Sequence, residues 1–191
     1  MLVVDLSTNV AGGFCAKLLA MGGADVLRFT ARGDQAPPAE QLLDAQLREA
    51  YLSSRSSVRA VDWSDPAALS AVRSAITQAA VVLTSFDGGQ YDNPFDASTI
   101  SSMNDGAVHV TVSSFGTEGP YSSWFGASLV DWAAGGYLSI TGDAEREPLA
   151  GPSELCGYVC GYWAAVAVEA GLARRRRWAS TGEHLDVSTM E

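Results

Sequence analysis

Short apolar runs alternate with segments of helical periodicity from the first residues of the chain. Residues 2–6 are apolar and β-branched, which predicts a buried strand. A turn of small residues follows, after which Phe14, Leu18 and Leu19 recur at the spacing of one helix face. Residues 25–29 then return to the strand pattern. The opening therefore predicts a strand, a helix and a second strand.

The same alternation continues along the rest of the chain. Periodicity and helix-start signals predict helices at residues 39–52, from 66 onward, at 128–138 and at 154–173. Short apolar runs predict strands at residues 58–61, 80–84, 108–112 and 184–187. Because strands and helices alternate throughout, the sequence predicts an α/β sandwich with a mostly parallel sheet. A length of 191 residues suits a single domain, residues 1–191.

Charge excludes two classes of partner. The formal net charge is −10, and the sequence pI is near 4.5, which argues against nucleic acid and against an anionic membrane. No apolar run is expected to approach the roughly 20 residues of a membrane span. The few arginines are informative because an anionic ligand would need local positive potential.

Cysteine usage favours a reducing compartment. The chain has three cysteines, Cys15, Cys156 and Cys160, and this odd number does not suggest a framework of disulfide bonds. Cys156 and Cys160 lack further ligands at metal spacing, so no metal site is predicted. The N-terminus has no basic region typical of a signal peptide. We expect a cytoplasmic protein.

The turn after the first strand has two interpretations. Thr8, Asn9 and Val10 precede a helix whose exposed backbone amides are a natural seat for phosphate or another anion. Alternatively, Asn9 and Thr8 shape the turn and cap the helix. The Gly12-Gly13 pair that follows does not form a G-x-G-x-x-G fingerprint.

Five segments, in order, resemble the class III coenzyme A transferases, the family of carnitine CoA-transferase, formyl-CoA transferase and α-methylacyl-CoA racemase. They are residues 5–26, 51–58, 81–86, 112–121 and 181–188. The resemblance implies a Rossmann-like three-layer sandwich that matches the N-terminal half of the family chain. It also implies coenzyme A or an acyl-CoA as substrate, together with a small carboxylic acid. Because family subunits interlock, we expect exposed apolar surface and a homo-oligomer or a paralogous partner subunit.

The resemblance also implies a binding edge. The turn at Thr8, Asn9 and Val10 would lie near the thioester. Arg55 would lie near the nucleotide of coenzyme A, and Arg28 and Arg32 would lie in the same kind of position. Alternatively, Arg55 is a solvated surface side chain. Ser85 and Phe86 match the loop that contacts the nucleotide. Asp87 stands where the family usually has an arginine, which predicts weaker coenzyme A binding.

The family nucleophile is an aspartate at the start of the long helix, where a carboxylate can attack the thioester. The register of the resemblance places Gly157 at this position. The nearest carboxylate is Glu154, which either is catalytic or gives electrostatic support to a helix capped by Ser153. The racemase base is absent, because residues 126–128 read Gly-Ala-Ser.

Two functions therefore remain open. The first is an acyl-CoA transferase that moves coenzyme A between carboxylic acids, with Glu154 or a partner's aspartate as nucleophile. The second is a catalytically silent, coenzyme A-binding or scaffold subunit of a heteromeric enzyme. Gly157 and Asp87 favour the second function, whereas the first turn and the loop at residues 115–121 favour the first. With glycine at position 157, we expect no turnover by the isolated chain.

Overall fold

The predicted alternation of strands and helices is present in the computed structural model, which describes residues 1–31, 39–91, 93–178 and 181–190. The strands are β1 (Leu2–Asp5), β2 (Asp25–Ala31), β3 (Ser56–Val61), β4 (Val81–Asp87), β5 (Gln90–Tyr91), β6 (Val108–Ser113) and β7 (His184–Ser188). The α-helices are α1 (Val10–Met21), α2 (Ala39–Leu52), α3 (Pro66–Gln78), α4 (Ala97–Met103), α5 (Ser128–Ala134) and α6 (Leu155–Trp178). A 3₁₀ turn, η1 (Tyr137–Ser139), follows α5.

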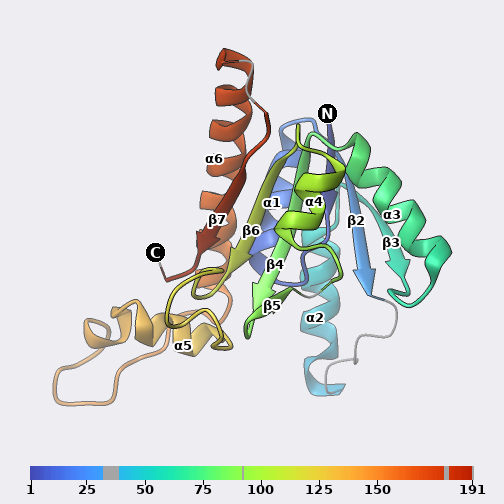
Figure 1. Cartoon of the computed structure of the whole chain (residues 1–191). Helices are drawn as coiled ribbons and strands as arrows, with labels where there is room; N and C mark the ends of the chain where they lie inside the picture. Colours follow the sequence, from blue (N-terminus) through green and yellow to red (C-terminus); the bar gives the residue numbers. More distant parts are fainter. Residues whose placement is uncertain (32–38, 92, 179–180, 191) are drawn as a thin grey trace.

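Six parallel strands form one sheet in the order β3-β2-β1-β4-β6-β7, and β5 pairs antiparallel with β4 (Figure 1). The chain builds the sheet outward from β1 to β3, then returns to β4 and builds toward β7. The strand order reverses between β1 and β4, which is the topological switch point of a doubly wound sheet. The α/β, Rossmann-like prediction is confirmed.

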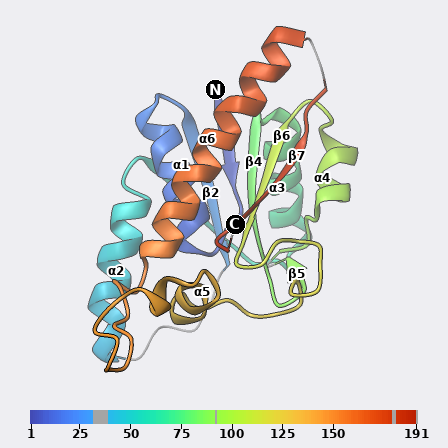
Figure 2. The ribbon, with the colours of Figure 1, turned by 90° about the vertical axis from the view of Figure 1, so that its left-hand side faces the viewer.

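Helices cover both faces of the sheet, which makes three layers. Figure 2 shows α1, α2 and α6 on one side of the strands and α3 and α4 on the other. Alternate residues of each strand enter different cores, as the pleat requires. Val3, Leu83 and Val110 pack against the α1 and α6 side, whereas Val4 and Val82 pack against the α3 and α4 side.

The close packing of α6 on α1 fixes where α6 begins. A Cβ at Gly161 would overlap the carbonyl oxygen of Ala11 and lie 3.1 Å from Cβ of Phe14. A Cβ at Gly157 would lie 3.1 Å from Cβ of Val10. The two glycines, one helical turn apart, therefore allow the backbones of the helices to approach.

The expectation that no segment reaches membrane-span length is wrong for α6. By length and composition this helix qualifies as a candidate span, and 33% of its most apolar window is buried in the fold. Its buried residues pack in the core beside α1 and the sheet.

Other differences from the predicted elements are local. The helix predicted at 128–138 ends at Ala134, because Gly135 follows and Gly136 adopts a φ of +79°. Helix α4 was not predicted, since its sequence Ala-Ser-Thr-Ile-Ser-Ser-Met carries little apolar periodicity. It is started by Asp96, whose Oδ1 accepts a hydrogen bond from the Thr99 amide at 2.7 Å.

Candidate functional site

A pocket of about 240 Å³ lies at the carboxyl edge of the sheet, beside the switch point. We refer to it as the edge pocket. Its lining comes from the segments after β1, β4, β6 and β7 and from the start of α6: Thr8, Asn9, Val10, Ala11, Phe86, Asp87, Ser113, Ser114, Gly126, Ala127, Ser128, Asp131, Ser153, Glu154, Gly157 and Thr189. Ligands of doubly wound folds bind at this edge. The structure thus brings together Thr8, Asn9, Val10, Phe86, Glu154 and Gly157, six positions that the sequence singled out.

Hydrogen bonds hold the turn between β1 and α1 in place. The Asn9 side chain caps α1, because its Oδ1 accepts a hydrogen bond from the Gly12 amide at 2.9 Å. The Thr8 amide donates to Oγ of Ser85 at 2.9 Å. Asn9 therefore caps the helix and also lines the pocket. Ser85 is buried and positions Thr8 from below.

A buried ion pair lies beneath this turn. Arg28 Nε is 3.4 Å from Oδ2 of the fully buried Asp5, whose Oδ1 accepts hydrogen bonds from the amide and hydroxyl of Ser7. Burial raises the pKa of Asp5, and the Arg28 charge opposes this shift. Arg28 is buried and paired with Asp5, so the structure places it beneath the turn and not at the exposed position where the sequence expected a phosphate contact.

The Gly12-Gly13 pair is explained by this buried cluster. A Cβ at Gly12 would overlap the Ser7 side chain, and a Cβ at Gly13 would lie 3.0 Å from Nη1 of Arg28. Both glycines therefore permit close packing beneath α1.

The other arginines lie away from the edge pocket. Arg55 directly precedes β3, and Ser56 pairs with Val26 near the start of β2. Arg55 is therefore at the amino edge of the parallel sheet, opposite the pocket, and the structure does not bring it together with Thr8 or Phe86. Arg32 lies outside the described residues.

Asp87 plays a structural part at the pocket rim. Its Oδ1 accepts hydrogen bonds from the Gly126 amide at 2.9 Å and the Gly88 amide at 3.1 Å. These bonds tie the end of β4 to the loop that leads into α5. Phe86, the preceding residue, packs edge-on against Tyr91 with ring centroids 5.1 Å apart.

Glu154 and Gly157 lie at the start of α6. The helix begins at Leu155, so Glu154 directly precedes it and is not in its first turn as expected. Glu154 Oε1 is 2.7 Å from Nη1 of Arg48 on α2. Its carbonyl oxygen accepts a hydrogen bond from the Tyr158 amide at 3.1 Å. This ion pair joins the start of α6 to α2, a contact that neither interpretation of Glu154 had included.

Asp131 is a pocket carboxylate that sequence reasoning missed. It lies on α5, lines the edge pocket and has one oxygen, Oδ1, that is buried without a hydrogen-bond partner among the described residues. Burial raises the pKa of Asp131, a hydrogen bond from Ser114 opposes the shift, and the nearby Asp87 charge adds to it. The only signal in the sequence was its position one helical turn after Ser128. The resembled family usually has an aspartate at the position of Ser128.

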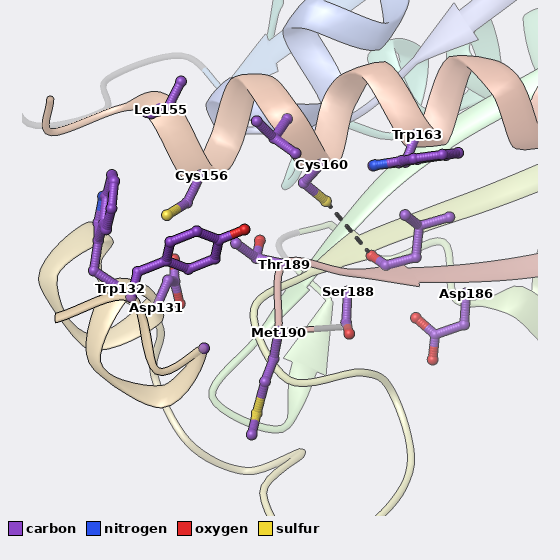
Figure 3. A pocket seen from close by; sticks show the side chains of 14 residues that line it. Asp131, Trp132, Leu155, Cys156, Cys160, Trp163, Asp186, Ser188, Thr189 and Met190 are labelled. Atoms are coloured by element: carbon purple, nitrogen blue, oxygen red, sulfur yellow. Dashed lines mark hydrogen bonds between the residues drawn. The ribbon is translucent and has the colours of Figure 1, made fainter. Parts of the chain in front are cut away.

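A second, larger cavity adjoins the first. This groove of about 740 Å³ runs between α5, the first turns of α6 and the end of β7, and we refer to it as the α5–α6 groove. Figure 3 shows Trp132, Leu155, Trp163 and Met190 around it, with Asp131 on the side of α5. Asp131 and Thr189 line both cavities.

The cysteines near the groove are not activated. Burial raises the pKa of Cys156, and it raises that of Cys160 to about 11. Both thiols therefore stay protonated near neutral pH, which disfavours a thiolate nucleophile. Among the described residues, no three His, Cys, Asp or Glu side chains are grouped as metal ligands would be.

The fold and the edge pocket define the class of protein: a doubly wound α/β protein with a pocket at its switch point. Residues 1–191 match CoA-transferase family III, and the chain belongs to this family.

Relatives named as CoA-transferases are similar to this chain over almost its whole length. The succinate–glutarate CoA-transferase of Agrobacterium fabrum is 24% identical over 200 residues, which cover 99% of this chain and 50% of that protein. The succinyl-CoA–D-citramalate CoA-transferase of Chloroflexus aurantiacus is 26% identical, with 99% and 48% covered. The beta subunit of the succinyl-CoA–L-malate CoA-transferase of the same organism is 25% identical. The chain spans about half the length of these relatives.

Solved structures agree on the fold. A CAIB/BAIF family protein from Brucella suis superposes with a TM-score of 0.83 at 21% identity, over 100% of this chain and 52% of that chain. Rv3272 from Mycobacterium tuberculosis gives a TM-score of 0.80 at 25% identity, over 100% and 54%.

Proposed function

We propose that the chain binds an acyl-CoA at the edge pocket and takes part in moving coenzyme A between carboxylic acids. The observation that carries this proposal is the pocket itself. The edge pocket lies at the switch point of a fold of CoA-transferase family III, and the β1–α1 turn, the end of β4 and the start of α6 all line it. The thioester would lie beside Thr8 and Val10.

The relatives suggest the class of acyl group. Three are named for reactions of succinate or succinyl-CoA with a second dicarboxylic acid. We therefore propose a short dicarboxylic acid as acyl group, with succinyl-CoA as the first substrate to test.

A catalytically silent subunit is the second candidate. Gly157 favours it, because a glycine has no side chain that can attack a thioester. One relative is named as a beta subunit, which supports a paralogous partner for this chain. In both cases the edge pocket would bind coenzyme A.

Calorimetric titration of succinyl-CoA and free coenzyme A into this chain tests the shared binding step. Ala127→Trp places a large side chain in the pocket, whereas Ala133→Trp, on the exposed side of α5, is its matched control. We expect at least tenfold weaker binding by the first variant and wild-type binding by the second. Equal affinity of all three proteins would refute the pocket as the site.

Two further measurements refine the proposal. Arg55→Ala should bind like the wild type, because Arg55 lies at the opposite edge of the sheet; a loss as large as that of Ala127→Trp would move the site there. Incubation with succinyl-CoA and a panel of dicarboxylates separates the two candidates. New acyl-CoA products support the transferase, and binding without products supports the silent subunit.

A further inference from the structure

We propose that Asp131 is the catalytic carboxylate of this chain and takes the place that Gly157 leaves vacant. This assignment rests on the proposed function, because it concerns the reaction of an acyl-CoA in the edge pocket. It replaces the expectation, drawn from Gly157 alone, that the isolated chain has no nucleophile of its own.

Three of the described residues that line the edge pocket carry carboxylates: Asp87, Asp131 and Glu154. Asp87 accepts two backbone hydrogen bonds and holds a loop. Glu154 is paired with Arg48, with Oε1 2.7 Å from Nη1, and this ion pair holds its side chain against α2. Asp131 has neither commitment: its neighbours are a hydroxyl, Ser114, and another carboxylate. Of the three, Asp131 is the carboxylate that the described contacts tie neither to a backbone amide nor to an arginine.

The position of Asp131 suits a thioester. Asp131 and Thr189 lie where the polar edge pocket meets the more apolar α5–α6 groove (Figure 3). With the thiol end of coenzyme A in the edge pocket and the acyl group toward the α5–α6 groove, the thioester would pass Asp131, which lines both cavities.

Ser128 supplies a second unpaired polar atom at the same place. Ser128 lines the pocket, and its Oγ is buried without a hydrogen-bond partner in the described part of the chain. A buried donor without a partner is costly, and a bound carbonyl oxygen would satisfy it. In the proposed reaction, the Ser128 hydroxyl would turn into the pocket and donate to the thioester oxygen as negative charge develops there.

The reaction at Asp131 balances without an added proton or redox partner. A carboxylate oxygen attacks the thioester carbon, the C–S bond breaks, and coenzyme A leaves as a thiolate, which forms a mixed anhydride. The thiolate then attacks the Asp131 carbonyl carbon, the bond between that carbon and the bridging oxygen breaks, and the donor carboxylate leaves with the bridging oxygen. An acceptor carboxylate reverses both steps on the resulting aspartyl thioester, which frees Asp131 and yields a new acyl-CoA.

Hydroxylamine trapping tests the assignment on the full chain. Hydroxylamine converts an aspartyl anhydride or thioester into a hydroxamate on the side chain that attacked, and peptide mass spectrometry locates it. After incubation with succinyl-CoA, we expect a hydroxamate on Asp131 in the wild type. We expect none in Asp131→Asn, and wild-type labelling in Glu169→Gln, an exposed carboxylate variant on α6.

Calorimetry on the same samples separates the possible failures. Asp131→Asn should keep succinyl-CoA binding within a few-fold of the wild type, because it preserves size and the contact with Ser114. Binding without a hydroxamate, or a hydroxamate on Glu154, overturns the assignment and leaves the proposed binding function intact. Absence of succinyl-CoA binding by the wild type overturns both.

Discussion

Substitution of Gly161 by alanine tests the packing that sets the start of α6. Two effects oppose each other. Alanine is favoured over glycine inside a helix by about 1 kcal/mol, which would stabilise α6. The new Cβ would overlap the Ala11 carbonyl oxygen and crowd Cβ of Phe14 at 3.1 Å. A backbone oxygen cannot rotate away, so α6 must move from α1.

Overpacking of a well-packed core costs about 1–3 kcal/mol, and contact with backbone belongs at the upper end of that range. After the helix-propensity gain is subtracted, we expect Gly161→Ala to lower the free energy of unfolding by about 2 kcal/mol. With a urea dependence of about 2 kcal/mol/M, the unfolding midpoint would fall by about 1 M. Coenzyme A binding should weaken too, because the shift displaces Gly157 at the pocket.

Urea unfolding monitored by circular dichroism measures the effect, and Ala170→Gly is the matched control. Ala170 is exposed on the same helix, so its variant reports the propensity term alone, a loss of about 1 kcal/mol. If Gly161→Ala were instead more stable than the wild type by a similar amount, α1 and α6 would not be in backbone contact and the reasoning would be refuted.

Three further predictions follow from single side chains. Burial lowers the pKa of His109 to about 3, so the contribution of neutral His109 to the free energy of unfolding is fully present above its ordinary pKa near 6.5 and falls by about 2 kcal/mol between pH 7.5 and 5. His109→Gln should remove this contribution to the pH dependence of urea unfolding. An unchanged pH dependence would contradict it. Asn9→Ala removes the α1 cap and should cost about 1 kcal/mol in the same assay, whereas wild-type stability would show that the cap contributes nothing. Tyr162 and Trp163 on α6 are 54% and 58% exposed, so the chain should self-associate as its concentration is raised in sedimentation runs. Trp163→Glu should reduce this self-association, and a strictly monomeric wild type would refute the prediction.

The fold was predictable wherever local pattern decides structure. The first strand, the helix after it and the helix at residues 39–52 carry clear periodicity, and each is present. The two-residue strand β5 was not predictable, because it exists only through its pairing with β4 beside Gly88 and Gly89. Short elements depend on tertiary contacts more than on their own sequence.

The candidate site was predictable only in part, for a similar reason. Thr8, Asn9 and Phe86 follow buried strands, and the carboxyl ends of parallel strands meet at one edge, so their convergence follows from topology. Arg28 appeared to be available for a ligand because its sequence neighbours do not reveal Asp5, which reaches it from the adjacent strand. Asp131 was overlooked because it lies on a short helix that tertiary contacts place at the pocket.

Two departures from the family pattern are connected in this structure. Asp87 stands where an arginine is usual, and its carboxylate binds the Gly126 amide, which fixes the approach to α5. A Cβ at Gly126 would overlap the Ser114 side chain, so the glycine there makes room for Ser114 beside Asp131. Asp87, Asp131 and Gly157 line the same pocket, and the Asp87–Gly126 hydrogen bond holds the loop that leads to Asp131. Considered separately, Asp87 and Gly157 suggest a site that has lost function. The proposal that Asp131 attacks the thioester instead gives this pocket a carboxylate from α5, and the hydroxamate experiment decides between the two.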